Sequence, residues 1–246
     1  MKIRQKIRLG IIFISFFLFP ATFYYLSPYL VIEATTKGVV NGSFIIFLFL
    51  FISSLVLGRG FCGWLCPASG CQEVVSQVRS KKVTKGNYVK WILWTPWIGS
   101  IILLLYNLGG YREIDLFYQT SHGLSIGNIY SLLTYILVLL LIVIPAFLIG
   151  RRSFCHHICW MAPFMIIGRS LRNIARWPSL HLIAKSDVCV RCSKCTDNCP
   201  MSLPVETMVQ NNVMENHECI LCGTCIDNCE QKTIHYSFKQ DLINLN

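Results

Sequence analysis

The chain has 246 residues, of which 54% are hydrophobic and only 14% are charged, whereas a soluble domain carries about 25% charged residues. This composition excludes a disordered chain, a coiled coil and an ordinary cytosolic enzyme. Residues 1–186 carry 18 Lys/Arg and four Asp/Glu, whereas residues 187–246 carry four Lys/Arg and eight Asp/Glu. Eight of the 13 cysteines also follow residue 188. We therefore expect a basic, apolar part followed by a small, acidic, cysteine-rich part.

Four apolar runs with almost no charge predict membrane-spanning helices. They cover about Leu9–Leu30, Val39–Gly58, Val89–Leu108 and Ile129–Ile149. Each has about 20 residues, which as a helix crosses a hydrocarbon core of roughly 30 Å. A buried core helix is the alternative for any one run, but four such runs favour a membrane domain. Lys and Arg gather before the first run, between the second and third, and after the fourth. The positive-inside rule therefore predicts a multi-pass protein of the cytoplasmic (inner) membrane with both termini in the cytoplasm.

The membrane part repeats a short motif. Each pair of apolar runs ends in Phe-Cys-x3-Cys, first at Cys62 and Cys66 and then at Cys155 and Cys159. The spacing indicates a parallel duplication, in which the two cysteine pairs face each other across a pseudo-twofold axis.

Three interpretations of these four cysteines remain open. They converge to hold iron, a [2Fe–2S] centre or another metal, they are redox-active thiols, or they are buried small residues in tight turns. His156 and His157 lie between the second pair of cysteines, where they are metal ligands, proton acceptors for a quinone, or hydrogen-bonded interfacial residues. None of the four apolar runs contains a histidine, which disfavours a b-type haem.

The cysteine-rich tail carries the strongest motif in the chain. Cys-x2-Cys-x2-Cys-x3-Cys, the run typical of bacterial ferredoxins, occurs twice, and the fourth cysteine of each run ligates the other cluster. We therefore expect one [4Fe–4S] cluster on Cys189, Cys192, Cys195 and Cys229, and a second on Cys219, Cys222, Cys225 and Cys199.

Zinc and disulfide bonds are the alternatives for the tail cysteines. Zinc sites use two separated cysteine pairs rather than this run, and disulfides are disfavoured in the cytoplasm, where the predicted topology places the tail. Glu230 stands where the second run often has proline; that position shapes a turn and does not ligate iron.

Between the two parts, Arg169, Arg172 and Arg176 recur at helical spacing among apolar residues. The pattern predicts an amphipathic helix along the anionic inner leaflet. The expected architecture is thus an all-α membrane domain of four helices with an internal two-helix duplication (1–163), an amphipathic connecting segment (164–186) and an α+β 2[4Fe–4S] ferredoxin-like domain (187–246).

The outer loop from Gly110 to His122 is the richest polar stretch outside the membrane. It is a solvated loop, a contact for an extracytoplasmic partner, or part of a quinol site with Glu113, Asp115 or His122 taking protons.

The motif Phe61-Cys62-Gly63-Trp64-Leu65-Cys66-Pro67, the second Cys-x3-Cys pair and the paired ferredoxin runs together resemble the NapH-type membrane iron–sulfur proteins. These are the quinol dehydrogenase membrane components linked to periplasmic nitrate reductase. The same modules recur in NosR-like proteins and in CcoG-type oxidase assembly proteins. The second pair departs from the pattern, because Trp160 rather than proline follows Cys159.

The resemblance implies a membrane protein that passes single electrons between the quinone pool and a redox partner protein, cytoplasmic or extracytoplasmic. One alternative is a CcoG-like redox or metal-reducing factor that assembles another metalloprotein, and a third hypothesis is a sensor or structural anchor whose clusters report oxygen or iron. The expected partners are the lipid bilayer, the quinone pool and a redox partner protein, and we expect no nucleic-acid partner.

Overall fold

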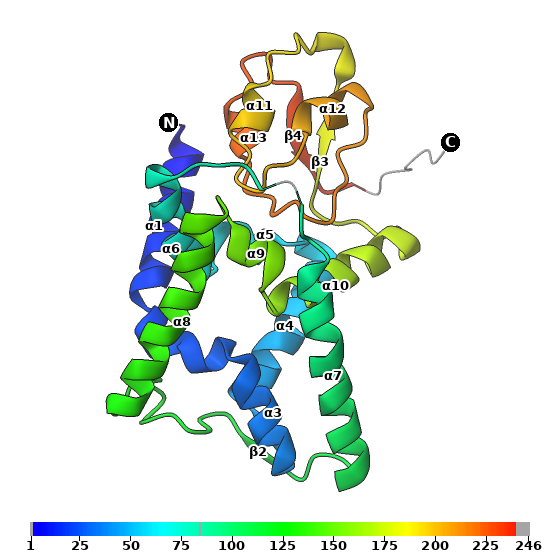
Figure 1. Ribbon diagram of the computed structural model, residues 1–246. Coiled ribbons are helices and arrows are strands. Elements are labelled where there is room, and N and C mark those ends of the chain that lie inside the picture. Colours follow the sequence, from blue (N-terminus) through cyan, green and yellow to red (C-terminus); the bar gives the residue numbers. More distant parts are fainter. Residues whose placement is uncertain (1, 84, 240–246) are drawn as a thin grey trace.

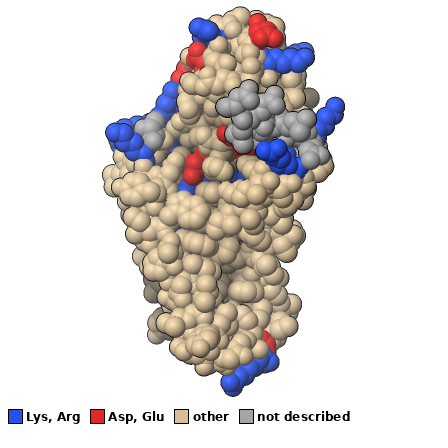
Figure 2. Space-filling model, turned by 90° about the vertical axis from the view of Figure 1, so that its right-hand side faces the viewer, with Lys and Arg blue, Asp and Glu red and all other residues tan. Residues whose placement is uncertain are grey.

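The computed structural model describes residues 2–83 and 85–239. It divides into an elongated helical part, α1 to α10, and a smaller part at one end that holds β3, β4 and the short helices α11 to α13 (Figure 1). We call these the membrane part and the ferredoxin part. In Figure 2 the exposed face carries no Lys, Arg, Asp or Glu over a broad band between the ferredoxin end and the opposite tip. A charge-free band of this kind suits contact with lipid.

Two helices are long and apolar enough to cross a membrane, α7 (Val89–Leu108) and α8 (Ile129–Leu148). The first apolar run is broken: α1 (Ile3–Phe17) meets the segment Phe19–Leu26 at a bend of 57°. Pro20 lies in the first turn of that segment. A helix accepts proline there, because the backbone N–H that proline lacks would have no partner in the first turn, and the fixed φ of proline favours the start of a new helix. The bent segment comprises α2 (Phe19–Thr22) and the 3-10 helix η1 (Phe23–Leu26).

The second apolar run forms α4 (Gly42–Leu57), which has 16 residues and a length of roughly 24 Å at 1.5 Å per residue. The residues at its two ends explain why α4 is short. The Asn41 side chain accepts a hydrogen bond from Phe44 N at the start, and Gly58 ends the helix at a φ of 54°. Of the four predicted spans, two are therefore full-length helices, a third is a bent pair, and the fourth is shorter than a usual span.

The predicted duplication has a structural counterpart. α4 is followed by α5 (Gly60–Trp64) and α6 (Pro67–Val78), and α8 is followed by α9 (Ser153–His157) and α10 (Met161–Ala175). In both repeats the second cysteine of the pair donates its backbone N–H to the phenylalanine just before the first cysteine, at 3.0 Å. The repeats also exchange partners, because α6 packs on α8 and α10 packs on α4. This reciprocal packing is what a pseudo-twofold arrangement requires.

At the end away from the ferredoxin part, α3 (Pro28–Thr36) leads into β1 (Val39–Asn41), which pairs in parallel with β2 (Glu113–Asp115). The segment after β2 passes close to Gly42, since a Cβ added at Gly42 would stand 2.6 Å from Leu116 O. The two repeats are thus joined at this end by backbone pairing.

The ferredoxin part contains an antiparallel pair, β3 (His181–Ala184) and β4 (Ile234–Ser237). Its other elements are short. They are η2 (Ser186–Val188), α11 (Lys194–Asp197), α12 (Val205–Gln210) and α13 (Thr224–Asp227). Because β3 pairs with β4, the compact unit begins within the predicted connecting segment, several residues before 187.

Charged pairs hold the ferredoxin part against the membrane part. The acidic side chains of the ferredoxin part meet basic side chains of the membrane part: Asp227 with Arg4 at 2.7 Å, Glu215 with Arg169 at 2.5 Å, and Glu218 with both Arg59 and Lys90. The opposite charges of the two halves of the sequence therefore face each other across this junction. Arg169 and Arg172 of α10 are buried, so they face the protein. The prediction that these two side chains lie against lipid headgroups is therefore wrong.

Candidate metal centres

The tail cysteines line two separate cavities in the ferredoxin part. One cavity is lined by Cys189, Cys192, Cys195 and Cys229. The other is lined by Cys199, Cys219, Cys222 and Cys225. Each set combines three cysteines of one run with the last cysteine of the other, which is the grouping expected for two interlocked clusters. We call the two sets the distal and the proximal site, respectively.

The backbone of both cysteine loops suits an anionic cluster. Arg191 and Ser193 in the distal loop have φ of 53° and 58°, and the equivalent Leu221 and Gly223 in the proximal loop have φ of 50° and 72°. Alternating conformations of this kind turn successive N–H groups toward one concavity and favour anions. Left-handed non-glycine residues also mark functional loops. Two loops of one shape, each closed by a cysteine from the other run, therefore fit a [4Fe–4S] cluster.

The two sites differ in exposure. Cys192 of the distal site is exposed, whereas Cys199, Cys222 and Cys225 of the proximal site are buried. The proximal loop faces the membrane part, and the distal loop faces away from it (Figure 1). Glu230, the departure from the ferredoxin run, is exposed and pairs with Lys194. Of the two sites, as far as the described residues go, the distal one is therefore the more exposed.

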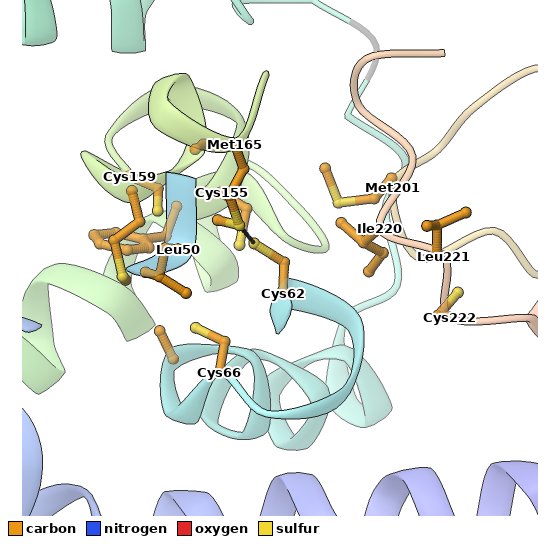
Figure 3. Packing of buried hydrophobic residues seen from close by; sticks show 14 of the residues in the cluster. Leu50, Cys62, Cys66, Cys155, Cys159, Met165, Met201, Ile220, Leu221 and Cys222 are labelled. Atoms are coloured by element: carbon orange, nitrogen blue, oxygen red, sulfur yellow. Dashed lines mark hydrogen bonds between the residues drawn. The ribbon is translucent and has the colours of Figure 1, made fainter. Parts of the chain in front are cut away.

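The four membrane cysteines lie together under the ferredoxin part, and all four are buried. The other three act electrostatically on Cys159, and Cys62 and Cys155 act on Cys66. The site also contains Met165, whose sulfur lies 3.9 Å from Cys62 Sγ, and Gln72, whose Nε2 donates to Cys155 Sγ at 3.2 Å. Figure 3 shows Cys62 between the other three cysteines and the Ile220–Cys222 segment of the proximal loop. We call Cys62, Cys66, Cys155 and Cys159 the four-cysteine site.

A single metal ion demands tight convergence of its ligands, whereas a cubane cluster separates its four thiolates by its own volume. In residues 2–83 and 85–239, no three His, Cys, Asp or Glu side chains converge as they do around one metal ion.

The two histidines of the second motif occupy different places. His156 is buried, and its Nδ1 contacts Asn87 Oδ1 at 2.5 Å. Burial lowers the pKa of His156 to about 4, which keeps the ring neutral at pH 7. His157 turns away, since its Nδ1 bonds Ser153 O and its ring packs against Gly86.

Buried ion pairs surround the four-cysteine site. Glu73 accepts hydrogen bonds from Arg8 at 3.0 Å and Arg152 at 2.6 Å. Burial opposes ionisation of Glu73, but the two arginines outweigh it and hold its pKa below the ordinary value. Glu218 behaves in the same way: burial raises its pKa, and the nearby cations Arg59 and Lys90 outweigh burial and lower it.

The sequence analysis did not predict these buried ion pairs. A usable signal exists in the motif, because an arginine stands three residues before the first cysteine of each pair, Arg59 before Cys62 and Arg152 before Cys155. Both arginines are among the largest fully buried side chains in the described chain.

The Cys62 motif contacts the proximal loop directly. A Cβ at Gly63 would lie 2.2 Å from Ile220 O, so only glycine allows this approach. The next residue, Trp64, donates its indole N–H to Leu221 O at 3.0 Å. The four-cysteine site and the proximal site are therefore neighbours, separated only by these packed segments.

An apolar cavity of about 470 Å³ lies on the other side of the four-cysteine site. Cys66 and Cys159 line it, together with aromatic and aliphatic side chains that include Phe19, Phe23 and Ile142. Its polar lining includes Glu33 and Gln119, with Gln119 donating to Glu33 Oε1 at 2.5 Å. The volume and lining are typical of a small-molecule site.

Among the loop residues considered for a quinol site, Glu113, Asp115 and His122 do not line this cavity. The sequence pattern did not single out Glu33, which enters from α3.

Comparison with known proteins matches three segments of the chain. A family model described as "4Fe-4S binding domain" matches twice, at residues 42–86 and 131–175, and each match contains one of the Cys-x3-Cys pairs. A second, described as "4Fe-4S dicluster domain", matches residues 188–234. The two matches of the first model confirm the predicted repeat.

Relatives include YccM of Escherichia coli (strain K12), named as an electron transport protein, with 22% identity over 76% of this chain and 54% of the relative. The methylamine utilization ferredoxin-type protein MauN of Methylobacillus flagellatus is 26% identical over 72% of this chain and 60% of the relative. An uncharacterised protein of Methanocaldococcus jannaschii is 25% identical over 69% of this chain and 70% of its own length. The chain thus spans little more than half of YccM and MauN. It has no significant match among solved structures. The chain therefore contains 4Fe–4S binding domains at the two Cys-x3-Cys pairs and in the cysteine-rich tail.

Proposed function

We propose that this protein is a multi-pass electron-transfer subunit of the cytoplasmic membrane. It passes single electrons between the quinone pool and a redox partner protein through two [4Fe–4S] clusters, held at the proximal and distal sites. The NapH-like motifs and the ferredoxin-type domains support this function. The distribution of Lys and Arg supports a cytoplasmic position for the ferredoxin part.

The observation that carries the proposal is the order of the sites. The apolar cavity borders Cys66 and Cys159, the same motifs contact the proximal loop through Gly63 and Trp64, and the proximal and distal sites share ligands between their runs. A carrier in the cavity is thereby placed at one end of a series of cysteine sites, and an exposed site lies at the other end.

The cavity side chains suit the ring of a quinone. A bound quinol supplies two electrons and two protons, so its site needs an apolar enclosure and a proton acceptor. Phe19, Phe23 and Ile142 contribute apolar side chains to the lining. Glu33 Oε1 provides a carboxylate acceptor, held by Gln119 and by the Tyr118 hydroxyl at 3.2 Å.

The distal site suits a protein partner. Cys192 is exposed, and Arg191 and Lys194 stand on either side of it in the sequence. The edge of the distal cluster would therefore be reachable by a redox protein without any rearrangement of the ferredoxin part.

The test is a quinol-reduction experiment with a matched pair of variants on α8. Val138 lines the cavity, whereas its neighbour Leu137 is exposed on the outer face of the helix. The protein is purified anaerobically in detergent, mixed with a reduced short-chain quinol, and followed by cluster absorbance. We expect quinol to bleach the wild-type protein and Leu137→Trp alike, and Val138→Trp at least about tenfold more slowly, because the indole fills the cavity.

Reduction by dithionite controls for cluster content and is expected to be equal in all three proteins. Absence of quinol reduction in wild type, or equal rates for the two variants, would contradict the proposal.

A further inference from the structure

The four-cysteine site lies in a region with a surplus of buried positive charge. Arg8, Arg59, Lys90 and Arg152 are all buried, and within residues 2–83 and 85–239 they share two carboxylates, Glu73 and Glu218. In the described residues the remaining carboxylates at this junction, Glu215 and Asp227, are paired with Arg169 and Arg4. Two positive charges of the group are therefore unmatched.

The surplus faces the cysteines. Arg59 acts electrostatically on Cys62 and Cys155, Arg152 on Cys155, and Lys90 on Cys159. An unmatched buried charge is strongly unfavourable, because the interior does not replace the hydration that the ion loses. Neutral thiols and disulfides leave the surplus in place. A centre with two negative charges removes it.

Hydrogen-bond donors near the cysteines point to the same kind of occupant. Arg59 is 1% exposed; its Nε and Nη2 make no hydrogen bond to an oxygen or nitrogen of the described residues, and the guanidinium acts on the Cys62 thiol. Buried donors are almost always satisfied, so two free donors on one guanidinium indicate that an acceptor belongs beside them.

The local backbone adds positive potential. Cys66 is the N-cap of α6, and Cys159 stands two residues before the start of α10. The backbone N–H groups of Ser69 and Ala162 stabilise the thiolate forms of Cys66 and Cys159, respectively. Both helices therefore direct their positive ends at the site, as at anion-binding helix termini.

We propose that Cys62, Cys66, Cys155 and Cys159 bind a third iron–sulfur cluster, a [4Fe–4S] centre that lies between the apolar cavity and the proximal site. Binding replaces four S–H bonds by four Fe–S bonds and releases four protons. Four thiolates on an oxidised core of two positive charges give a centre of charge minus two, which matches the two unpaired cations.

An iron–sulfur cluster is favoured over other dianionic centres for two reasons. Each cysteine pair lies in a segment that matches a 4Fe-4S binding model. The site also adjoins the proximal cysteine loop, where a redox-inert metal would have no use. Its role as an electron relay rests on the proposed function: the centre accepts one electron from the carrier in the cavity and donates it to the proximal cluster. The existence of the centre does not depend on quinone.

The first test is a metal count on the full chain, purified anaerobically. We expect about twelve irons and twelve acid-labile sulfides per chain, against about eight of each for two clusters. Cys62→Ser combined with Cys155→Ser is expected to remove about a third of the iron and leave the spectroscopic signals of the two ferredoxin clusters intact. Cys71→Ser is the matched control, because Cys71 is also buried but lies outside the four-cysteine site.

About eight irons in the wild-type protein, with or without one bound zinc, would overturn the proposal. So would an iron count unchanged by the double substitution. A full iron count without quinol reduction would instead contradict the proposed function and leave the third centre in place.

A second pair of variants leaves all four cysteines of the four-cysteine site in place. Arg59→Gln removes a cation from the site, and Arg79→Gln removes an exposed cation at the end of α6. Reduction makes the centre more negative, so loss of Arg59 is expected to shift the midpoint potential of the third cluster downward in a redox titration followed by electron paramagnetic resonance. Arg79→Gln is expected to leave it unchanged. An equal potential in both variants would contradict the cation-compensated centre.

Discussion

The ferredoxin loops and the four-cysteine site both present four thiols to one place, yet they prepare for negative charge by different means. In the ferredoxin loops the preparation is local: left-handed residues such as Ser193 and Gly223 turn backbone N–H groups inward, and Cys192 remains exposed. In the four-cysteine site the preparation comes from distant segments, through Arg59, Arg152 and the helix starts of α6 and α10.

The difference teaches that the segments supplying a site decide how its charge is balanced. Where one loop supplies three of the four thiols, its own backbone amides face the site, at the exposed distal site and at the buried proximal site alike. Under the ferredoxin part, full ionic charges are buried beside the thiols, and two carboxylates, Glu73 and Glu218, hold these cations in place.

The largest effect is expected from breaking the ferredoxin run itself. Cys222→Ser removes a ligand from the proximal site, and we expect the loss of about four irons per chain, together with loosening of the loop that contacts Gly63 and Trp64. Iron analysis and circular dichroism measure both effects. An unchanged iron content would show that the proximal cavity does not hold a cluster through Cys222.

The next largest effect is expected from the carboxylate shared by two buried cations. Glu218→Gln leaves Arg59 and Lys90 without their common partner, and breaking a buried pair in this way costs about 3–5 kcal/mol. Glu230→Gln is the control, since that carboxylate is exposed and pairs with the exposed Lys194. Denaturant unfolding in detergent measures the stability of the two variants. Equal midpoints for the two variants would contradict the ionic account of the junction.

A third effect follows from the close contact between the two cysteine regions. Gly63→Ala places a methyl group against Ile220 O, and the overpacking is expected to cost about 1–3 kcal/mol and to slow reduction of the ferredoxin clusters by quinol. Gly60→Ala in the same helix meets no atom closer than 3.9 Å and serves as the matched control. Similar reduction kinetics in both proteins would show that the contact between Gly63 and Ile220 does not take part in electron transfer.

The smallest effect is the dependence of stability on acid. Glu73 and Glu218 have lowered pKa values in the folded protein, so their contribution is present above the ordinary glutamate pKa and is lost as pH falls through the folded-state value. We expect stability to decline below about pH 4 and Glu73→Gln to flatten that decline. Unfolding midpoints measured across this range give the answer, and a decline as steep in Glu73→Gln as in wild type would exclude this carboxylate.

The same contrast explains what the sequence could reveal. The x2-x2-x3 spacing lies within a dozen residues, so the ferredoxin ligands and their exchange between runs could be predicted from the chain. The Cys-x3-Cys repeat was predicted in the same way and is confirmed by the two matches of one family model. Helix lengths were less readable, because Pro20 and Gly58 cut two apolar runs that look continuous by composition. The burial of Arg169 was misjudged, because helical spacing does not distinguish a lipid surface from a protein surface.

Long-range features were beyond sequence reasoning. Glu73 meets Arg8 and Arg152 from elements far apart in the chain, and Glu33 reaches the cavity from α3. No local pattern encodes such contacts, since they depend on how the two repeats pack against each other.

The central claim is that electrons reach the ferredoxin clusters by way of the four-cysteine site. The most direct measurement mixes reduced quinol with the Cys62→Ser, Cys155→Ser protein and follows the ferredoxin clusters, with dithionite reduction as the control. The account predicts normal reduction by dithionite and a loss of at least about tenfold in the rate with quinol, while Cys71→Ser behaves as wild type. Reduction by quinol at the wild-type rate would contradict it.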